Sequence, residues 1–172
     1  MPTAQTWIDR LDLQAHPEGG FYRETYRTDL QVPADALPDR FDGARDVAAL
    51  IYFLLTADSF SALHRIRQDE VWHFYAGAPV TLHQIRPDGS RSATTLSRAV
   101  EEGHRLHTVV PAETWFGATV ADAGPEYALV GCTTAPAFDF SDFELADRDA
   151  LIEAHPEHRS LIERLTRRGN AT

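Results

Sequence analysis

A series of short segments with the composition of β-strands occupies most of the chain between residues 47 and 132. Turn residues separate them, most clearly at Pro87-Asp88-Gly89-Ser90, which is typical of a hairpin. Many short strands with turn signals between them indicate a β-sandwich or a β-barrel. The expected strands are residues 47–55, 60–66, 70–75, 80–86, 91–96, 106–110, 115–120 and 127–132.

The segments on either side of this series have other patterns. Residues 6–13 carry apolar side chains at nearly helical spacing, and residues 21–27 alternate as a strand does. Residues 29–45 contain two prolines and a glycine, and they are expected to form an exposed loop. Residues 148–154 and 157–167 have helical spacing, with Pro156 between them or opening the second helix.

The length and these patterns predict one domain over residues 1–172. Its barrel core is expected at about residues 20–146, followed by a helical tail at 147–172.

Composition excludes several classes of protein. The net charge of −10 disfavours binding to nucleic acid or to an anionic membrane, because both need clustered lysine and arginine. The longest apolar run, residues 47–55, is too short to span a bilayer as a helix. Because no signal peptide is recognisable at the N-terminus, a cytoplasmic protein is expected. Cys132, the only cysteine, lies in an apolar run and is expected to be a buried, inert thiol.

The segment from Ser61 to Gly77 places His64 on one expected strand and Glu70 at the start of the next. It resembles the first motif of the metal-binding cupins, which reads His-x-His, three or four residues, Glu, six residues, Gly. His64, Glu70 and Gly77 match that pattern, and Ile66 stands at the place of its second histidine.

Further segments extend the resemblance, and together they are similar to the cupin-5 family of small cupins. The likeness covers most of residues 7–146 and implies an all-β fold, a double-stranded β-helix (jelly-roll) barrel, here with short N- and C-terminal helices. It also implies a homodimer and an internal pocket for a small-molecule ligand. The matching segments are residues 16–27, 51–55, 64–77, 110–112, 129–133 and 138–145.

The resemblance to metal-binding cupins implies three histidines and one glutamate around a metal ion. Ile66 and Phe116 occupy two of the four matching places, and neither side chain can donate a lone pair. We therefore expect no metal and no other cofactor. The alternative is a divalent transition metal held by His64, Glu70 and His73, which would need a β-bulge because alternation puts His73 and Glu70 on opposite faces. His83 is a further candidate ligand.

Alternation along the strands points Ala62, His64 and Ile66 into the barrel and brings Glu70 beside His64. A buried carboxylate needs a hydrogen-bond partner, and the histidine is the simplest one. The pair either anchors two strands or performs acid–base catalysis, in which Glu70 orients the His64 imidazole. Residues 61–64 are also similar to the stretch that carries the base histidine in dehydrorhamnose epimerases, so His64 could abstract a proton next to a carbonyl.

Other residues are candidates for the pocket wall. Four of them, on neighbouring strands, could stabilise an enolate or return a proton, and the aromatic ones are either core residues or a surface that stacks on a ligand. Residues 16–20 form a turn after the first helix or a lid over the pocket, and the aromatics of residues 138–143 suggest an ordered edge that covers the barrel or a partner subunit. The candidate pocket residues are Ile66, Trp72, Phe74, Tyr22, Arg23, Tyr26, Tyr52, Trp115 and Phe116.

The leading expectation for function is a small-molecule-binding cupin that performs metal-independent isomerase or epimerase chemistry on a carbohydrate-like or keto substrate. His64 and Glu70 are its expected catalytic residues. The alternatives are a ligand-binding cupin without catalysis, and a metal-dependent oxygenase or isomerase with an incomplete ligand set.

Overall fold

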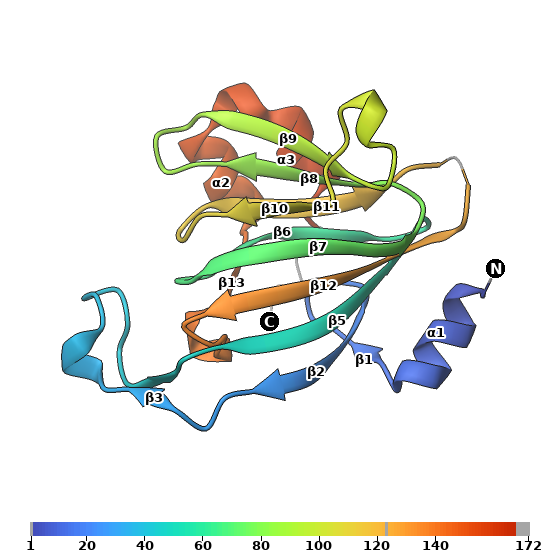
Figure 1. Cartoon of the computed structure of the whole chain (residues 1–172). Helices are drawn as coiled ribbons and strands as arrows, with labels where there is room; N and C mark the ends of the chain where they lie inside the picture. The colour runs from blue at the N-terminus through green and yellow to red at the C-terminus, as the bar shows by residue number, and fades with distance from the viewer. Residues whose placement is uncertain (1, 123, 168–172) are drawn as a thin grey trace.

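Two β-sheets pack face to face in the computed structural model, which describes residues 2–122 and 124–167, and short helices lie on their outer faces (Figure 1). The six-stranded sheet has the order β1-β2-β5-β12-β7-β10, and the five-stranded sheet has the order β13-β6-β11-β8-β9. A small two-stranded sheet pairs β3 with β4. The strands are β1 (Gln14–Ala15), β2 (Phe21–Arg27), β3 (Gln31–Val32), β4 (Arg45–Asp46), β5 (Ala49–Thr56), β6 (Phe60–Arg65), β7 (Asp69–Gly77), β8 (Val80–Ile85), β9 (Arg91–Leu96), β10 (His107–Val110), β11 (Trp115–Val120), β12 (Tyr127–Ala135) and β13 (Glu144–Leu145).

The expected strands all form, with ends that shift by a few residues. The expected loop at residues 29–45 contains two short strands and a 3-10 turn, so it is more ordered than its composition indicates. The second C-terminal helix is shorter than predicted, because Pro156 begins a separate 3-10 turn and the α-helix ends at Arg164. The helices are α1 (Ala4–Leu11), α2 (Arg148–Ala154) and α3 (Arg159–Arg164), with 3-10 turns η1 (Ala34–Ala36), η2 (Val100–Glu102), η3 (Phe140–Asp142) and η4 (Pro156–His158).

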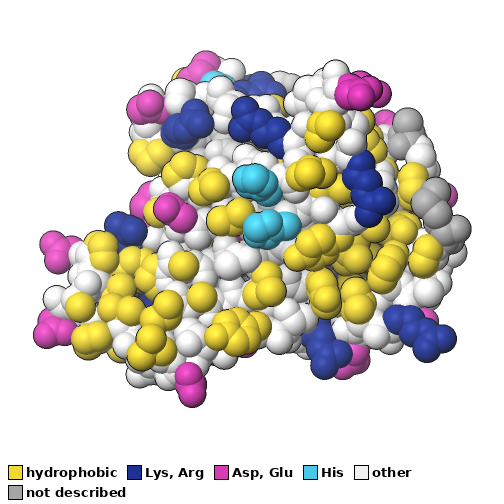
Figure 2. Space-filling model, in the orientation of Figure 1, with side chains coloured by type: hydrophobic (Ala, Val, Ile, Leu, Met, Phe, Trp, Pro, Cys, Tyr) yellow, Lys and Arg dark blue, Asp and Glu magenta, His cyan; other side chains and the backbone are white. Residues whose placement is uncertain are grey.

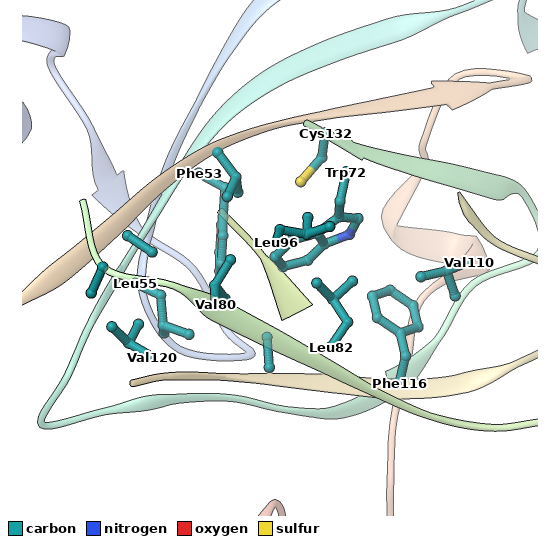
Figure 3. Packing of buried hydrophobic residues seen from close by; sticks show 14 of the residues in the cluster. Phe53, Leu55, Trp72, Val80, Leu82, Leu96, Val110, Phe116, Val120 and Cys132 are labelled. Atoms are coloured by element: carbon teal, nitrogen blue, oxygen red, sulfur yellow. The ribbon is translucent and has the colours of Figure 1, made fainter. Parts of the chain in front are cut away.

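The main hydrophobic core fills the space between the two sheets (Figure 3). It forms because alternate side chains of each strand point inward, where burial of apolar area stabilises the fold by about 25 cal/mol per Å². Phe53 and Trp72 from the six-stranded sheet meet Phe116 from the five-stranded sheet, and each of these side chains is at most 2% exposed.

The outer faces of both sheets are partly covered by helices. Leu63 of β6 and Ile85 of β8 pack against α2 and α3, and Leu63 also forms backbone hydrogen bonds with Leu165 (2.7 Å) and Ala146 (2.9 Å). The apolar face of α1 packs on the other sheet around Leu54. Figure 2 shows the molecule from the side of Figure 1, with hydrophobic and histidine side chains between charged groups. Within the described residues, no helix has the length and apolar character needed to cross a membrane.

Leu63 provides a test of this helix packing, because it is fully buried and points away from the core between the sheets. We expect Leu63→Ala to lower the free energy of unfolding by about 2–5 kcal/mol, through lost burial and the cavity left behind. Leu106→Ala, at a residue that is 52% exposed, should cost less than about 1 kcal/mol. Urea denaturation measures both values, and equal costs would contradict the packing.

Candidate functional site

A cavity of about 380 Å³ opens between the sheets at the end where β2, β5, β6, β7 and β12 come together. Its size lies within the usual range for small-molecule sites. Its wall is made by these strands, by the turn before β2 and by residues 138–143. The residues that line it are Gln14, His16, Glu18, Tyr22, Glu24, Arg27, Ala49, Ile51, Phe53, His64, Ile66, Glu70, Trp72, Cys132, Thr134, Phe138, Asp139, Phe140 and Phe143.

The turn at residues 16–20 inserts Glu18 into this cavity. Backbone hydrogen bonds close the turn between His16 and Gly19 and between His16 and Gly20, each at 3.0 Å. Gly19 and Gly20 both have positive φ angles, and a Cβ on Gly20 would collide with the backbone oxygen of Leu54. The two glycines therefore let the chain approach the barrel strands closely. Of the two sequence interpretations, the turn is correct, and its function at the site is to supply a carboxyl group.

Glu18 is held against strand β6 by its backbone and by its side chain. Its carbonyl oxygen accepts hydrogen bonds from the Ala62 amide at 2.8 Å and from Arg167 at 2.6 Å. Its carboxyl oxygen Oε1 accepts a hydrogen bond from the Ser61 hydroxyl at 2.7 Å. The other oxygen, Oε2, lies 3.1 Å from Nε2 of His64 and 3.3 Å from Nδ1 of His16.

Both nitrogens of the His64 ring are therefore engaged. Nδ1 lies 2.7 Å from the carbonyl oxygen of Ala62, to which it donates, and Nε2 faces Glu18. Burial lowers the pKa of His64, and burial also raises the pKa of Glu18, partly offset by His16 and Ser61. Burial therefore favours the neutral forms of both the imidazole and the carboxyl group.

The sequence-based pairing of His64 with Glu70 needs correction. Glu70 lines the same cavity, but the carboxyl group within ion-pair distance of His64 is that of Glu18. The reason is that the turn before β2 occupies the space beside His64, a contact between residues far apart in the sequence. Glu70 is 9% exposed, and burial, together with the nearby Glu18, raises its pKa from 4.5 to about 7.

The polar surroundings of Glu70 are sparse. Among the described residues, no lysine, arginine or histidine nitrogen lies within ion-pair distance of its carboxyl group. His64, the Trp72 indole and the Cys132 thiol only partly offset the rise in the pKa of Glu70, and Trp72 Nε1 has no hydrogen-bond partner of its own. Cys132 is buried, as expected, and burial raises the pKa of its thiol, which makes it a poor nucleophile.

Residues 138–143, here called the aromatic segment, close one side of the cavity with Phe138, Phe140 and Phe143. The segment is anchored by the buried Asp142, whose two carboxylate oxygens accept hydrogen bonds from Arg45 at 2.6 and 2.8 Å. Such a two-point pair is geometrically specific and difficult to replace. The expected ordered edge therefore covers this chain's own barrel.

Of the nine wall candidates from the sequence, the cavity is lined by Tyr22, Ile66 and Trp72. Phe116 is completely buried and its ring centroid lies 4.1 Å from that of His64, so it packs against the His64 ring without lining the cavity. Phe74 packs against the main core and does not line the cavity either.

The other four candidates lie outside the cavity. Arg23 donates to the carbonyl oxygen of Leu11 at the end of α1, and Tyr52 packs in the cluster around that helix. Tyr26 is 57% exposed, because a bulge in β2 between Glu24 and Tyr26 changes which side chains face inward. Trp115 packs with the C-terminal helices on the outer face of the other sheet.

The bulge in β2 places Arg27 in the cavity wall, and sequence reasoning missed this residue together with Glu18 and Glu24. For Glu18 a signal was present, since an acidic residue directly before two glycines can be carried into a close backbone contact. The alternation argument had no means of locating the bulge.

The sequence offers, as an alternative, a transition metal held by three side chains. His73 pairs with His107 across two strands, with ring centroids 6.2 Å apart, and does not line the cavity, so the alternative set His64, Glu70 and His73 is not brought together. His83 faces Arg164, and burial with Arg164 lowers its pKa to about 4. Throughout residues 2–122 and 124–167, no three His, Cys, Asp or Glu side chains are grouped to hold a metal.

A comparison with known protein families assigns this chain to one of them. The family described as "Cupin superfamily (DUF985)", or cupin-5, matches residues 5–146. The chain belongs to the cupin-5 family. The resemblance inferred from residues 7–146 is confirmed, and so is the all-β jelly-roll fold of this cupin. No curated protein matches its sequence significantly.

Two solved structures are similar to this cupin over nearly its whole length. A hypothetical protein from Leishmania major is 35% identical, with a TM-score of 0.88, and the match covers 97% of this chain and 100% of the other. A protein from Shewanella oneidensis is 36% identical, with a TM-score of 0.87 and coverages of 98% and 100%. Oxalate decarboxylase from Bacillus subtilis is 12% identical with a TM-score of 0.54, over 90% of this chain and 37% of that one, and shares the fold alone.

The raised pKa of Glu70 predicts how the stability of the fold changes with pH. The folded protein holds a proton on Glu70 between pH 4.5 and about 7, whereas the unfolded chain has lost it, so Glu70 reduces stability as pH rises through this range. We expect the free energy of unfolding of Glu70→Gln, relative to that of the wild type, to increase by about 3 kcal/mol from pH 4 to pH 8. Urea denaturation at several pH values measures the gain.

Glu101→Gln, at an exposed residue of η2, provides the matched control for the change of side chain. A stability difference between Glu70→Gln and the wild type that does not change with pH would contradict the environment described for Glu70.

Proposed function

We propose that this cupin is a metal-independent isomerase or epimerase, which moves a carbon-bound proton next to a carbonyl group in a small carbohydrate-like or keto compound. The observation that carries the proposal is the Glu70 carboxyl in the cavity with a pKa of about 7. A general base is most effective when its pKa lies near the working pH, and enzymes obtain such glutamates by burial.

The proposed step begins with Glu70 in its carboxylate form. Glu70 takes the proton from the substrate carbon, and the electron pair of the broken C–H bond moves into the carbonyl group to form an enolate. Glu18, whose Oε2 lies 3.1 Å from Nε2 of His64, turns its single carboxyl proton from His64 to the enolate oxygen and so stabilises the enolate. Glu70 returns its proton to the neighbouring carbon to give an isomer. A proton from water on the other face of the same carbon gives an epimer, and Glu70 then releases its own proton to water; neither outcome involves net oxidation.

The role of His64 differs in this proposal from the one inferred from sequence. Because both of its ring nitrogens are engaged by Ala62 and Glu18, His64 acts through Glu18 and is a positioning residue. Its contact with Oε2 fixes the orientation of the Glu18 carboxyl group beside the substrate.

Proton exchange with heavy water tests the proposal. The protein is incubated in D₂O with a panel of aldoses, ketoses and 2-keto acids, and NMR or mass spectrometry detects the replacement of C–H by C–D. We expect exchange in at least one compound, a loss of about 100-fold or more in Glu70→Gln, and a smaller loss in His64→Ala. His73→Ala, a histidine outside the cavity, should retain the wild-type rate.

Carbonyl compounds of the panel that bind in the cavity, with no exchange in any of them, would contradict the proposal and favour a non-catalytic ligand-binding cupin. Exchange that requires an added transition metal would also contradict it.

A homodimer and a cytoplasmic location stay predictions from the sequence. Exposed apolar side chains on the outer face of the six-stranded sheet, such as Val109 at 48% exposure, are compatible with a partner there.

A further inference from the structure

The charges that line the cavity are almost all negative. Glu18, Glu24, Glu70 and Asp139 contribute carboxyl groups, and Arg27 contributes the only arginine or lysine of the described lining. Burial lowers the pKa of both histidines in the wall, so neither of them supplies a lasting positive charge at neutral pH.

Arg27 is not available to a ligand. Its guanidinium donates to both carboxylate oxygens of Glu24, at 3.0 and 2.8 Å, and to Asp46 at 3.1 Å. It also donates to the carbonyl oxygen of Phe138 at 2.9 Å. An anionic ligand would therefore meet no free cation in this wall, and burying it beside Glu18 and Glu70 would be costly.

The aromatic segment adds a second source of negative potential. The rings of Phe138, Phe140 and Phe143 are inclined to one another by 73–80°, with centroids 5.0–6.1 Å apart. Rings that are nearly perpendicular turn π faces in different directions, and the face of an aromatic ring attracts cations. Two distinct features of the wall, the buried carboxyl groups and the phenylalanine rings, thus favour the same sign of charge.

We propose that the cavity binds its ligand through an organic ammonium group, held between the Glu70 carboxylate and the rings of the aromatic segment. The inference rests on the proposed function and names its substrate class, a carbonyl compound that also carries an amine, such as an amino ketone or an amino sugar. The ammonium group supplies the positive charge that Glu70 lacks among its protein neighbours.

The same arrangement makes the affinity for a cationic ligand depend on pH. The groups that face Glu70 are Glu18 from the turn, His64 from β6, Cys132 from β12 and Trp72 from its own strand. A bound cation stabilises the carboxylate form of Glu70 against the acid form, so its affinity should rise as pH increases from 6 to 8. A neutral ligand should lack this dependence.

Calorimetric titration with two compounds of equal shape tests the inference. Choline carries a trimethylammonium group, and 3,3-dimethylbutan-1-ol replaces that group with an uncharged tert-butyl group. At pH 8, with EDTA present, we expect choline to bind about 10-fold more tightly or better. Glu70→Gln should remove most of this preference, whereas the exposed Glu101→Gln should retain it.

A second variant separates the π face from hydrophobic contact. Phe140 is 51% exposed, so its replacement should leave the fold intact, which circular dichroism checks. Phe140→Leu should weaken choline by about 3-fold or more and leave the neutral alcohol nearly unchanged, and Phe140→Tyr should bind choline as the wild type does.

Three results would each overturn the inference. They are equal affinities for the two compounds, no measurable binding of choline at 10 mM (a Kd of 10 mM corresponds to about −2.7 kcal/mol), and choline binding that is unchanged in Glu70→Gln. Its failure is distinguishable from that of the proposed function. Choline preference without deuterium exchange in any ligand leaves the inference standing and refutes the isomerase, whereas exchange in neutral ketoses without an ammonium preference does the reverse.

Discussion

The contact between the Glu18 carboxyl and the His64 imidazole determines the character of the cavity. The backbone oxygen of Glu18 accepts hydrogen bonds from the Ala62 amide and the Arg167 guanidinium, and its carboxyl group accepts one from Ser61, so Glu18 is held against strand β6. Once it is there, both nitrogens of His64 are occupied, and a second carboxyl group nearby, Glu70, is left without a cationic partner among the described residues.

This arrangement costs stability, as functional sites often do. Burial makes the charged forms of Glu18, Glu70 and His64 unfavourable, and it shifts the pKa of the acids upward and that of the histidine downward. The surrounding structure offsets the cost with the Ser61 hydrogen bond to Glu18 and with rigid packing around Phe116. Proton transfer at neutral pH and attraction for a cation both follow from the same two carboxyl groups.

The fold and the strand half of the site could be predicted from the sequence, because alternation holds from His64 to Ile66 and from Glu70 to Trp72 and turns these side chains inward. It failed where geometry departs from that period. The bulge in β2 exposes Tyr26. Glu18, the partner of His64, lies in the turn before β2, and Ser61, to which it is also hydrogen-bonded, is 43 residues away along the chain. Such long-range contacts depend on how two segments dock, which the period of either segment does not encode.

The most direct test is a ¹³C NMR titration of the glutamate side-chain carboxyl groups in the ligand-free protein. We expect two glutamates with a pKa raised above 4.5, Glu70 at about 7 and Glu18 shifted in the same direction, and we expect the corresponding signals to be missing in Glu18→Gln and Glu70→Gln. Glutamates that all titrate at their ordinary pKa would show that these carboxyl groups are solvated and would contradict the buried Glu18–His64 contact.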